Sequence, residues 1–253
     1  MAKKDTKDST DLATIPVAQA LMERPSFLAE EDTRGTENIR SSDIRPPALR
    51  IAQSMTPQTK RSDPSYVEGL LEGHFFNTLT NENFGEGPLE IVILNQLGAR
   101  YVEFEPGNTG VVLDFNVPED DPRAQFTSEI INGVSVRVKP RATKFYDYLI
   151  LLVQGSRRTM MTLSLKSTQL KKAMQLNTIL KTLKAPSFAL RFSVTSVAEK
   201  KGNNNFYGWK FQPAGWVDES LYREASDLYD TMADKTIVPD VDVTPELEED
   251  PFS

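Results

Sequence analysis

The sequence predicts a mainly β fold that also contains helices, with the strands arranged as a Greek-key barrel. Two observations support this fold class. Apolar and polar residues alternate at several places between residues 89 and 211, as they do in half-buried strands. One long segment, 167–183, has apolar residues at helical spacing and interrupts these strands. An all-β sandwich needs no long helix at this point, so its position favours a barrel.

Six strands are expected before this helix. Residues 89–94 are almost continuously apolar, and 146–153 have the composition of a central strand. Val134, Val136 and Val138 alternate with polar and basic residues, which indicates a half-buried strand with a basic outer face. The six predicted strands cover residues 89–94, 100–105, 111–115, 134–138, 146–153 and 159–165.

The helix begins at Ser167, a residue that favours the N-cap position, and ends before Pro186. Two strands, at 188–197 and 206–211, follow it, and a second amphipathic helix is expected at 220–233. The order strand, strand, helix, strand, strand resembles that of the OB-fold, a Greek-key barrel with a helix between its third and fourth strands. OB-folds commonly bind single-stranded nucleic acid, which supplies a functional expectation by analogy of fold.

The two ends of the chain differ from its middle in composition. Residues 1–60 are mostly polar and are expected to form a flexible N-terminal segment, in which 46–55 docks as an edge segment through Leu49 and Ile51. Residues 61–217 are assigned to an OB-fold-like nucleic-acid-binding domain, 218–235 to a C-terminal helix, and 236–253 to an acidic, disordered tail.

Composition excludes several classes of protein. The 253 residues contain no cysteine and one histidine, which rules out disulfides, thiolate metal sites and multi-histidine zinc sites. No apolar run approaches the roughly 20 residues that span a bilayer, and the N-terminus lacks the apolar core of a signal peptide. P-loop, Gly-x-Ser-x-Gly and His-Glu-x-x-His motifs are absent from the sequence. We therefore expect a cytoplasmic protein without enzymatic activity, cofactor, metal or membrane partner.

Charge is sorted along the chain. Residues 134–210 contain 15 Lys and Arg against two acidic residues, Asp147 and Glu199, whereas residues 211–253 contain 12 Asp and Glu against two basic residues. The formal net charge of −7 conceals this division. A basic block interleaved with aromatic residues is typical of proteins that bind a polyanion.

Binding a single strand requires cations along a groove for the phosphates and flat side chains on which bases stack. Strand alternation points some cations of the basic block outward, and others lie in loops. Trp209 shares a strand face with Tyr207 and Phe211, which favours its burial, whereas Phe206 and Lys210 share the opposite face. The lysines of the predicted helix are interpreted as a solvated face. The candidate DNA-binding residues are Arg137, Lys139, Arg141, Lys144, Tyr146, Tyr148, Arg157, Arg158, Lys166, Arg191, Lys200, Lys201, Phe206, Trp209 and Lys210.

The acidic end of the chain carries one aromatic residue, Phe252, just before the last residue. Acidic C-termini often serve solubility alone, but an aromatic side chain adds nothing to solubility and therefore favours docking. We expect the tail to recruit partner proteins and to compete with DNA for the basic surface. Its candidate partner-binding residues are Glu246, Glu248, Glu249, Asp250 and Phe252.

These features together resemble those of bacteriophage single-stranded DNA-binding proteins, including the T7-like class. The resemblance covers residues 66–253 and includes the lysine-rich helix, the polar loop at 200–205 before an aromatic strand, the segment 73–80 and the acidic tail with Phe252. It implies a tail that docks replication and repair proteins, although here Ser253 follows the phenylalanine.

The sequence therefore predicts a non-catalytic protein that coats single-stranded DNA with little sequence preference, in the host cytoplasm if it is encoded by a phage. Its partners would be single-stranded DNA, replication or recombination proteins and a second copy of the chain. Two alternatives stay open. One is a phage structural or accessory protein whose basic block binds an acidic partner, and the other is a single-strand annealing factor.

Overall fold

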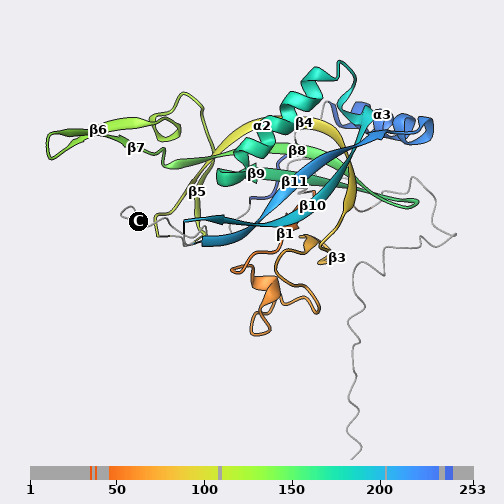
Figure 1. The fold of residues 1–253 in the computed structure, drawn as a ribbon, viewed down its shortest axis with the longest axis horizontal. Helices are drawn as coiled ribbons and strands as arrows, with labels where there is room; N and C mark the ends of the chain where they lie inside the picture. Colours follow the sequence, from red (N-terminus) through yellow and green to blue (C-terminus); the bar gives the residue numbers. More distant parts are fainter. Residues whose placement is uncertain are drawn as a thin grey trace, which may run out of the picture.

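The computed structural model describes residues 35, 38, 46–107, 110–202, 204–233 and 237–241. Most strands in this part of the chain belong to one twisted antiparallel sheet, beside a small sheet, a two-stranded arm and two helices (Figure 1). The strands are β1 (Leu49–Ile51), β2 (Phe75–Asn77), β3 (Asn83–Gly85), β4 (Leu89–Phe104), β5 (Val112–Val117), β6 (Thr127–Ile131), β7 (Val134–Val138), β8 (Ala142–Gln154), β9 (Arg157–Lys166), β10 (Leu190–Lys201) and β11 (Asn204–Trp216), and the helices are α2 (Leu170–Thr182) and α3 (Glu219–Ala233).

The main sheet has the strand order β11-β10-β4-β8-β9, with β5 paired to β4 outside this path. If the five strands of that path are numbered along the chain, their order is 5-4-1-2-3. Helix α2 joins the third strand to the fourth, and α3 follows the fifth. The predicted mainly β fold, with one helix between the third and fourth strands and another near the C-terminal end, is confirmed.

Strand β4 is shared by both halves of the sheet. Its first residues, Leu89–Val92, pair with β10, and residues 90–103 pair with β8. Two register shifts in the pairing with β8 accompany a pronounced bend, which Figure 1 shows in yellow. The sequence predicted two strands here with a turn at Gly98. The structure instead has one strand of 16 residues, because Gly98 lies at a register shift inside the ladder.

The sheet does not close into a barrel, because no pairing joins β9 to β11 in the described residues. The N-terminal segment lies in the gap. Ala48 forms a parallel bridge with Thr162 of β9. On the other side, the Gln53 amide binds the backbone of Tyr207 in β11: its Nε2 donates to the carbonyl at 2.8 Å, and its Oε1 accepts from the N–H at 2.9 Å. One side chain thus replaces the backbone partner that a neighbouring strand would supply.

A second glutamine binds the same edge of β11. Gln169, in the turn that precedes α2, accepts a hydrogen bond from the backbone N–H of Trp209 at 3.1 Å. Its side chain passes close to Gly208, where an added Cβ would lie 3.0 Å from the Gln169 nitrogen and 2.7 Å from the Glu199 carboxylate. Both atoms are at the ends of flexible side chains, so a larger residue at position 208 would require Gln169 and Glu199 to move. Residues 47–53 and the start of α2 together lie between β9 and β11.

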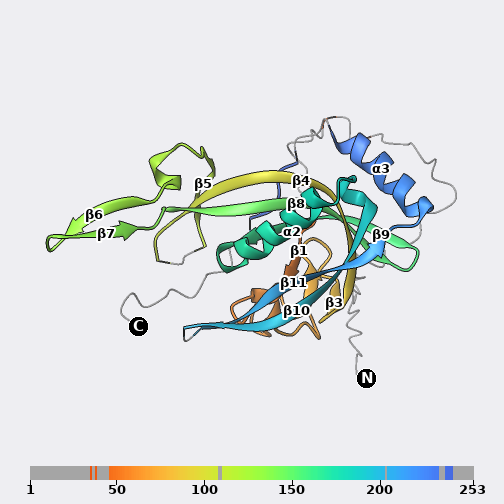
Figure 2. The ribbon, with the colours of Figure 1, turned by 45° about the horizontal axis from the view of Figure 1, so that its top comes forward.

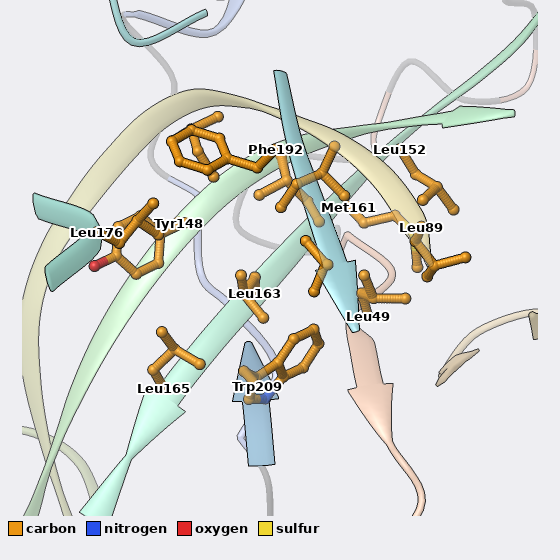
Figure 3. Packing of buried hydrophobic residues seen from close by; sticks show 14 of the residues in the cluster. Leu49, Leu89, Tyr148, Leu152, Met161, Leu163, Leu165, Leu176, Phe192 and Trp209 are labelled. Atoms are coloured by element: carbon orange, nitrogen blue, oxygen red, sulfur yellow. The ribbon is translucent and has the colours of Figure 1, made fainter. Parts of the chain in front are cut away.

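Both faces of the main sheet are buried. Alternate residues of β8, which include Tyr148, Ile150 and Leu152, join the larger core together with β9, β10, β11 and α2 (Figure 3). The residues between them, Leu149 and Leu151, pack with α3 on the opposite face. Because each fully buried side chain of this size contributes about 1.5–3 kcal/mol, the continuous apolar run of β8 anchors both layers.

The folded part begins earlier and ends later than the sequence predicted. Residues 46–60 belong to it, although the flexible segment was assigned to 1–60. The docking expected for 46–55 is confirmed, because Leu49 and Ile51 enter the larger core and β1 pairs with β2. At the other end, residues 237–241 do not belong to a disordered tail. Val241 is buried, and Asp240 Oδ2 accepts a hydrogen bond from Arg50 Nη2 at 2.8 Å.

Strands β6 and β7 form an arm that projects away from the sheet in both views (Figures 1 and 2). The arm is anchored at its base, where Arg123 binds the carboxylates of Asp121, Glu103 and Asp114 at 2.8–3.1 Å. Hydrogen bonds from Arg123 lower the pKa of Asp121 to about 2. The arm is an insertion between the first and second long strands.

Candidate nucleic-acid interface

Several cations that the sequence assigned to outward strand faces and loops have acidic partners. Arg157 donates two hydrogen bonds to the Glu82 carboxylate, at 2.6 and 2.8 Å. The looser pairs are Arg158 with Glu224 at 3.8 Å, Arg191 with Glu90 at 3.6 Å and Arg141 with Glu103 at 3.7 Å. An exposed ion pair is worth only about 0.2–1 kcal/mol, but each acidic partner reduces the positive potential that a phosphate would meet.

The cations near the base of the arm lie against aromatic rings. The guanidinium carbon of Arg137, on β7, lies 3.9 Å from the ring centroid of Phe126. Lys144 Nζ lies 5.2 Å and 5.1 Å from the ring centroids of Tyr101 and Tyr146. A hydrogen bond with Tyr101 raises the pKa of Lys144, so this lysine stays charged at neutral pH. Lys144 and the half-buried Tyr146 are therefore an adjacent cation and aromatic ring, as single-strand binding requires.

The outer face of β4, β8 and β9 is covered by α3 and by residues 237–241. Lys166 lies on this covered side, with its Nζ 5.7 Å and 5.8 Å from the ring centroids of Phe104 and Phe145. Asp147, one of the two acidic residues of the basic block, is buried here and accepts hydrogen bonds from Arg100 and Ser164. Lys166, which strand alternation assigned to an outward face, thus does not line an open groove.

Two of the predicted stacking residues are buried. Tyr148 is fully buried, and its hydroxyl donates to Asn177 at 2.8 Å, while burial raises its pKa. Trp209 is 6% exposed and packs against Phe75 and Phe211, with ring centroids 5.2 and 5.9 Å away. The prediction that these two residues stack on bases is wrong, because both point into the larger core. The alternation that put Tyr207, Trp209 and Phe211 on the core face is confirmed.

An open basic surface lies along α2 and the neighbouring strand β11. A groove of about 520 Å³ runs between them, lined by Lys172, Met174, Gln175, Leu176, Thr178, Ile179, Lys210 and Phe211. Lys172 binds Glu199, the other acidic residue of the basic block, at 3.0 Å. Across the described residues, no acidic partner is found for Lys171, Lys181, Lys184 or Lys210. The sequence assigned the helix lysines to a solvated face and so left them out of the site.

The β10–β11 hairpin continues this surface. Lys200 and Lys201 are exposed at its tip, and Phe206 is half-buried on the face opposite Trp209. The hairpin tip, the start of α2 and the base of the arm lie at the same end of the molecule in both views (Figures 1 and 2). We call this end the basic end; its predicted residues are Lys144, Tyr146, Lys200, Lys201, Phe206 and Lys210, and the structure adds Lys171, Lys172 and Phe211.

The predicted partner-binding residues Glu246, Glu248, Glu249, Asp250 and Phe252 lie outside the described residues. The last described residue before them, Val241, packs against Val102 and Phe145 at the covered face of the sheet. Within the described ranges, no helix is long and apolar enough to cross a bilayer, and no group of three His, Asp or Glu side chains is arranged to hold a metal ion.

Comparison with known proteins gives one result. A family model described as Pam3 phage gp34-like protein matches residues 17–238. No curated protein and no solved structure matches the chain. The match includes every element of the main sheet, the arm and both helices.

Proposed function

Since the chain belongs to the family of Pam3 phage gp34-like proteins, we propose that it is a phage-encoded, non-catalytic protein that coats single-stranded DNA with little sequence preference. Its place of action is the host cytoplasm, during phage DNA replication, recombination or repair. The family itself is one of bacteriophage proteins. The DNA-binding part of the proposal depends on the chemistry of the basic end.

The observation that carries the proposal is the set of lysines along α2 and the β10–β11 hairpin. Lys171, Lys200 and Lys210 have no acidic partner in the ranges that the structure describes, whereas most cations elsewhere on the sheet do. A row of exposed ammonium groups gains free energy when phosphates replace its counterions. Phe206 is half-buried on the face of β11 that also carries Lys210, and its ring offers a surface on which a base can stack.

The strand order supports the same function by analogy of fold. The order 5-4-1-2-3, with a helix between the third and fourth strands, resembles the plan of an OB-fold, in a sheet that is left open. OB-folds bind oligonucleotides partly through the loops between strands 1 and 2 and between strands 4 and 5. In this chain those loops are the insertion that carries the arm and the turn at the hairpin tip, and both lie at the basic end.

The acidic tail gives the proposed site a regulator. Residues 242–253 contain five of the chain's acidic residues and follow directly on the docked Val241. The tail would compete with DNA phosphates for the lysines of the basic end and would present Phe252 to replication or recombination proteins once DNA has displaced it. Salt weakens both interactions, so the competition is expected to be greatest at low ionic strength.

The proposal is tested by the binding of a fluorescent oligothymidine of about 30 nucleotides, compared with a duplex of the same length, across a salt series. We expect single strands to bind more tightly than duplex and the affinity to fall steeply with salt. Equal affinity for both forms would refute the proposal.

The exposed apolar side chains of the arm favour one alternative, a phage structural or accessory protein that binds other proteins. Ile130, Val134 and Val136 are about two-fifths to four-fifths exposed there. That alternative predicts weak, length-independent DNA binding and a stable assembly. A single-strand annealing factor would differ from both by accelerating the pairing of complementary strands.

A further inference from the structure

Exposed apolar side chains are concentrated in β5 and in the arm that follows it. Seven of the 15 large apolar side chains that are exposed in the described ranges lie between residues 111 and 136, and they come from β5, β6, β7 and their neighbouring turns. A hairpin of two strands is marginally stable by itself in water, and gains stability from a third strand or a packed face. In the described residues no third strand pairs with β6 or β7, so the arm lacks the neighbour that would stabilise it.

The register of the arm places the three valines of β7 on one face of the ribbon. Cross-strand pairs share a face, so Val134, Val136 and Val138 lie on the side that also carries Glu129 of β6, and Ser135 and Arg137 lie on the side that carries Ile130. Val134 is 63% exposed and Val136 is 41% exposed. The ladder between β6 and β7 is regular from 127 to 138, without a bulge.

The two outer edges of the arm differ in what they can pair with. In the described residues β6 and β7 pair only with each other, so each has a free edge. Natural edge strands are usually protected by bulges, prolines or several charges. Strand β7, with the sequence Val-Ser-Val-Arg-Val, has one charge and three β-branched apolar residues.

We propose that β7 pairs antiparallel with β7 of a second copy of this chain, about a two-fold axis beside Val136. The two arms then form one sheet of four strands, in the order β6-β7-β7-β6. In this register Val136 lies opposite Val136 of the second copy, and Val134 lies opposite Val138, so the valines of the two β7 strands lie side by side. Ser135 lies opposite Arg137, and no like charges oppose each other.

Charge distinguishes this register from the equivalent pairing through β6. Pairing the whole of β6 with itself places Glu129 opposite Glu129 of the second copy, and like charges directly opposed destabilise a sheet. Two-fold symmetry requires the same patch on both copies, which β7 provides. The acidic residues near the arm, Asp114, Glu119 and Asp121, argue against a nucleic acid as its occupant. The inference does not depend on the proposed DNA binding.

Cysteine cross-linking of the full chain tests both the partner and the register. The chain has no cysteine, so Val136→Cys introduces the only thiol. Directly opposed residues of antiparallel strands have Cα atoms about 4.5–5.5 Å apart, which suits a disulfide. We expect Val136→Cys to form a disulfide-linked dimer under mild oxidation. The matched control is Leu79→Cys, because Leu79 is an exposed leucine at 66% in the turn of the small sheet, and it should cross-link far more slowly.

Sedimentation equilibrium supplies the second measurement. We expect the wild-type chain to be a dimer and Val136→Lys to raise the dimer dissociation constant at least about tenfold, because it opposes two lysines at the axis. Leu79→Lys should leave the constant unchanged, and circular dichroism checks that both variants are folded. A wild-type monomer at every accessible concentration would overturn the proposal. A dimer that Val136→Cys fails to cross-link would overturn the β7 register, and dimerisation without DNA binding would refute the proposed function while leaving this inference intact.

Discussion

The double variant Lys200→Gln/Lys210→Gln tests whether the hairpin lysines contact phosphates. Both lysines are exposed, lie on β10 or β11, and have no acidic partner among the described residues. Replacing them removes positive charge without breaking an ion pair that the structure describes. The fold should be unaffected, because neither side chain belongs to a core cluster.

The expected effect follows from counterion release. Each phosphate that a cation neutralises on a single strand contributes roughly 0.7 to the slope of log affinity against log salt concentration. If Lys200 and Lys210 each contact one phosphate, the double variant loses about 1.4 from the magnitude of that slope. Its affinity should therefore fall most at low salt and approach that of the wild type at high salt. Fluorescence anisotropy with oligothymidine over a salt series measures the slope directly.

A matched control separates local contact from overall charge. Lys60→Gln/Arg61→Gln makes the same change in net charge at an exposed turn that belongs to neither α2 nor the hairpin. Its salt slope should equal that of the wild type. Equal slopes for the wild type and the hairpin variant, or equal losses for both variants, would refute the assignment of DNA binding to the basic end.

Three other outcomes are expected. Gln53→Ala removes both hydrogen bonds to Tyr207 and should lower the free energy of unfolding in urea by about 1–3 kcal/mol, whereas Gln58→Ala in the next turn should change it by no more than about 0.5 kcal/mol. Asp121 has a pKa of about 2 in the folded chain, below the ordinary value of 3.8 for an aspartate, because Arg123 donates hydrogen bonds to it. The stabilisation that it gives is therefore present above about pH 4 and is lost as the pH falls towards 2, so thermal unfolding of Asp121→Asn should depend less on pH in this interval than that of the wild type. Deletion of residues 242–253 should tighten binding to oligothymidine at low salt, and an unchanged affinity would contradict competition by the tail.

The order of strands and helices was predictable because it depends on local periodicity. The alternation of 206–211 correctly assigned Trp209 to the core, and the spacing of apolar residues located α2 within a few residues. Gly98 was wrongly predicted to form a turn, because glycine is common both in turns and at irregular positions within a strand.

The binding surface was less predictable because charge pairing is a property of the folded chain. Arg157 and its partner Glu82 are separated by 75 residues, and nothing in the sequence around either one reveals the other. Lysines on α2 were discounted, since helical spacing alone does not distinguish a solvated face from a ligand-binding one. The fold places α2 beside β11 and the hairpin tip, and this arrangement makes the lysines candidates for binding phosphates.

The gap-filling segment at residues 47–53 has a consequence for how the protein is made. Its partners lie far ahead in the chain: Pro47 contacts Thr162 over 115 residues, Gln53 contacts Tyr207 over 154, and Arg50 contacts Asp240 over 190. At a translation rate of about 5–20 residues per second, the segment leaves the ribosome roughly 10–40 s before its last partner is synthesised. During that interval Leu49 and Ile51 have no completed core to enter. The first part of the fold to be synthesised is thus among the last to form all of its contacts.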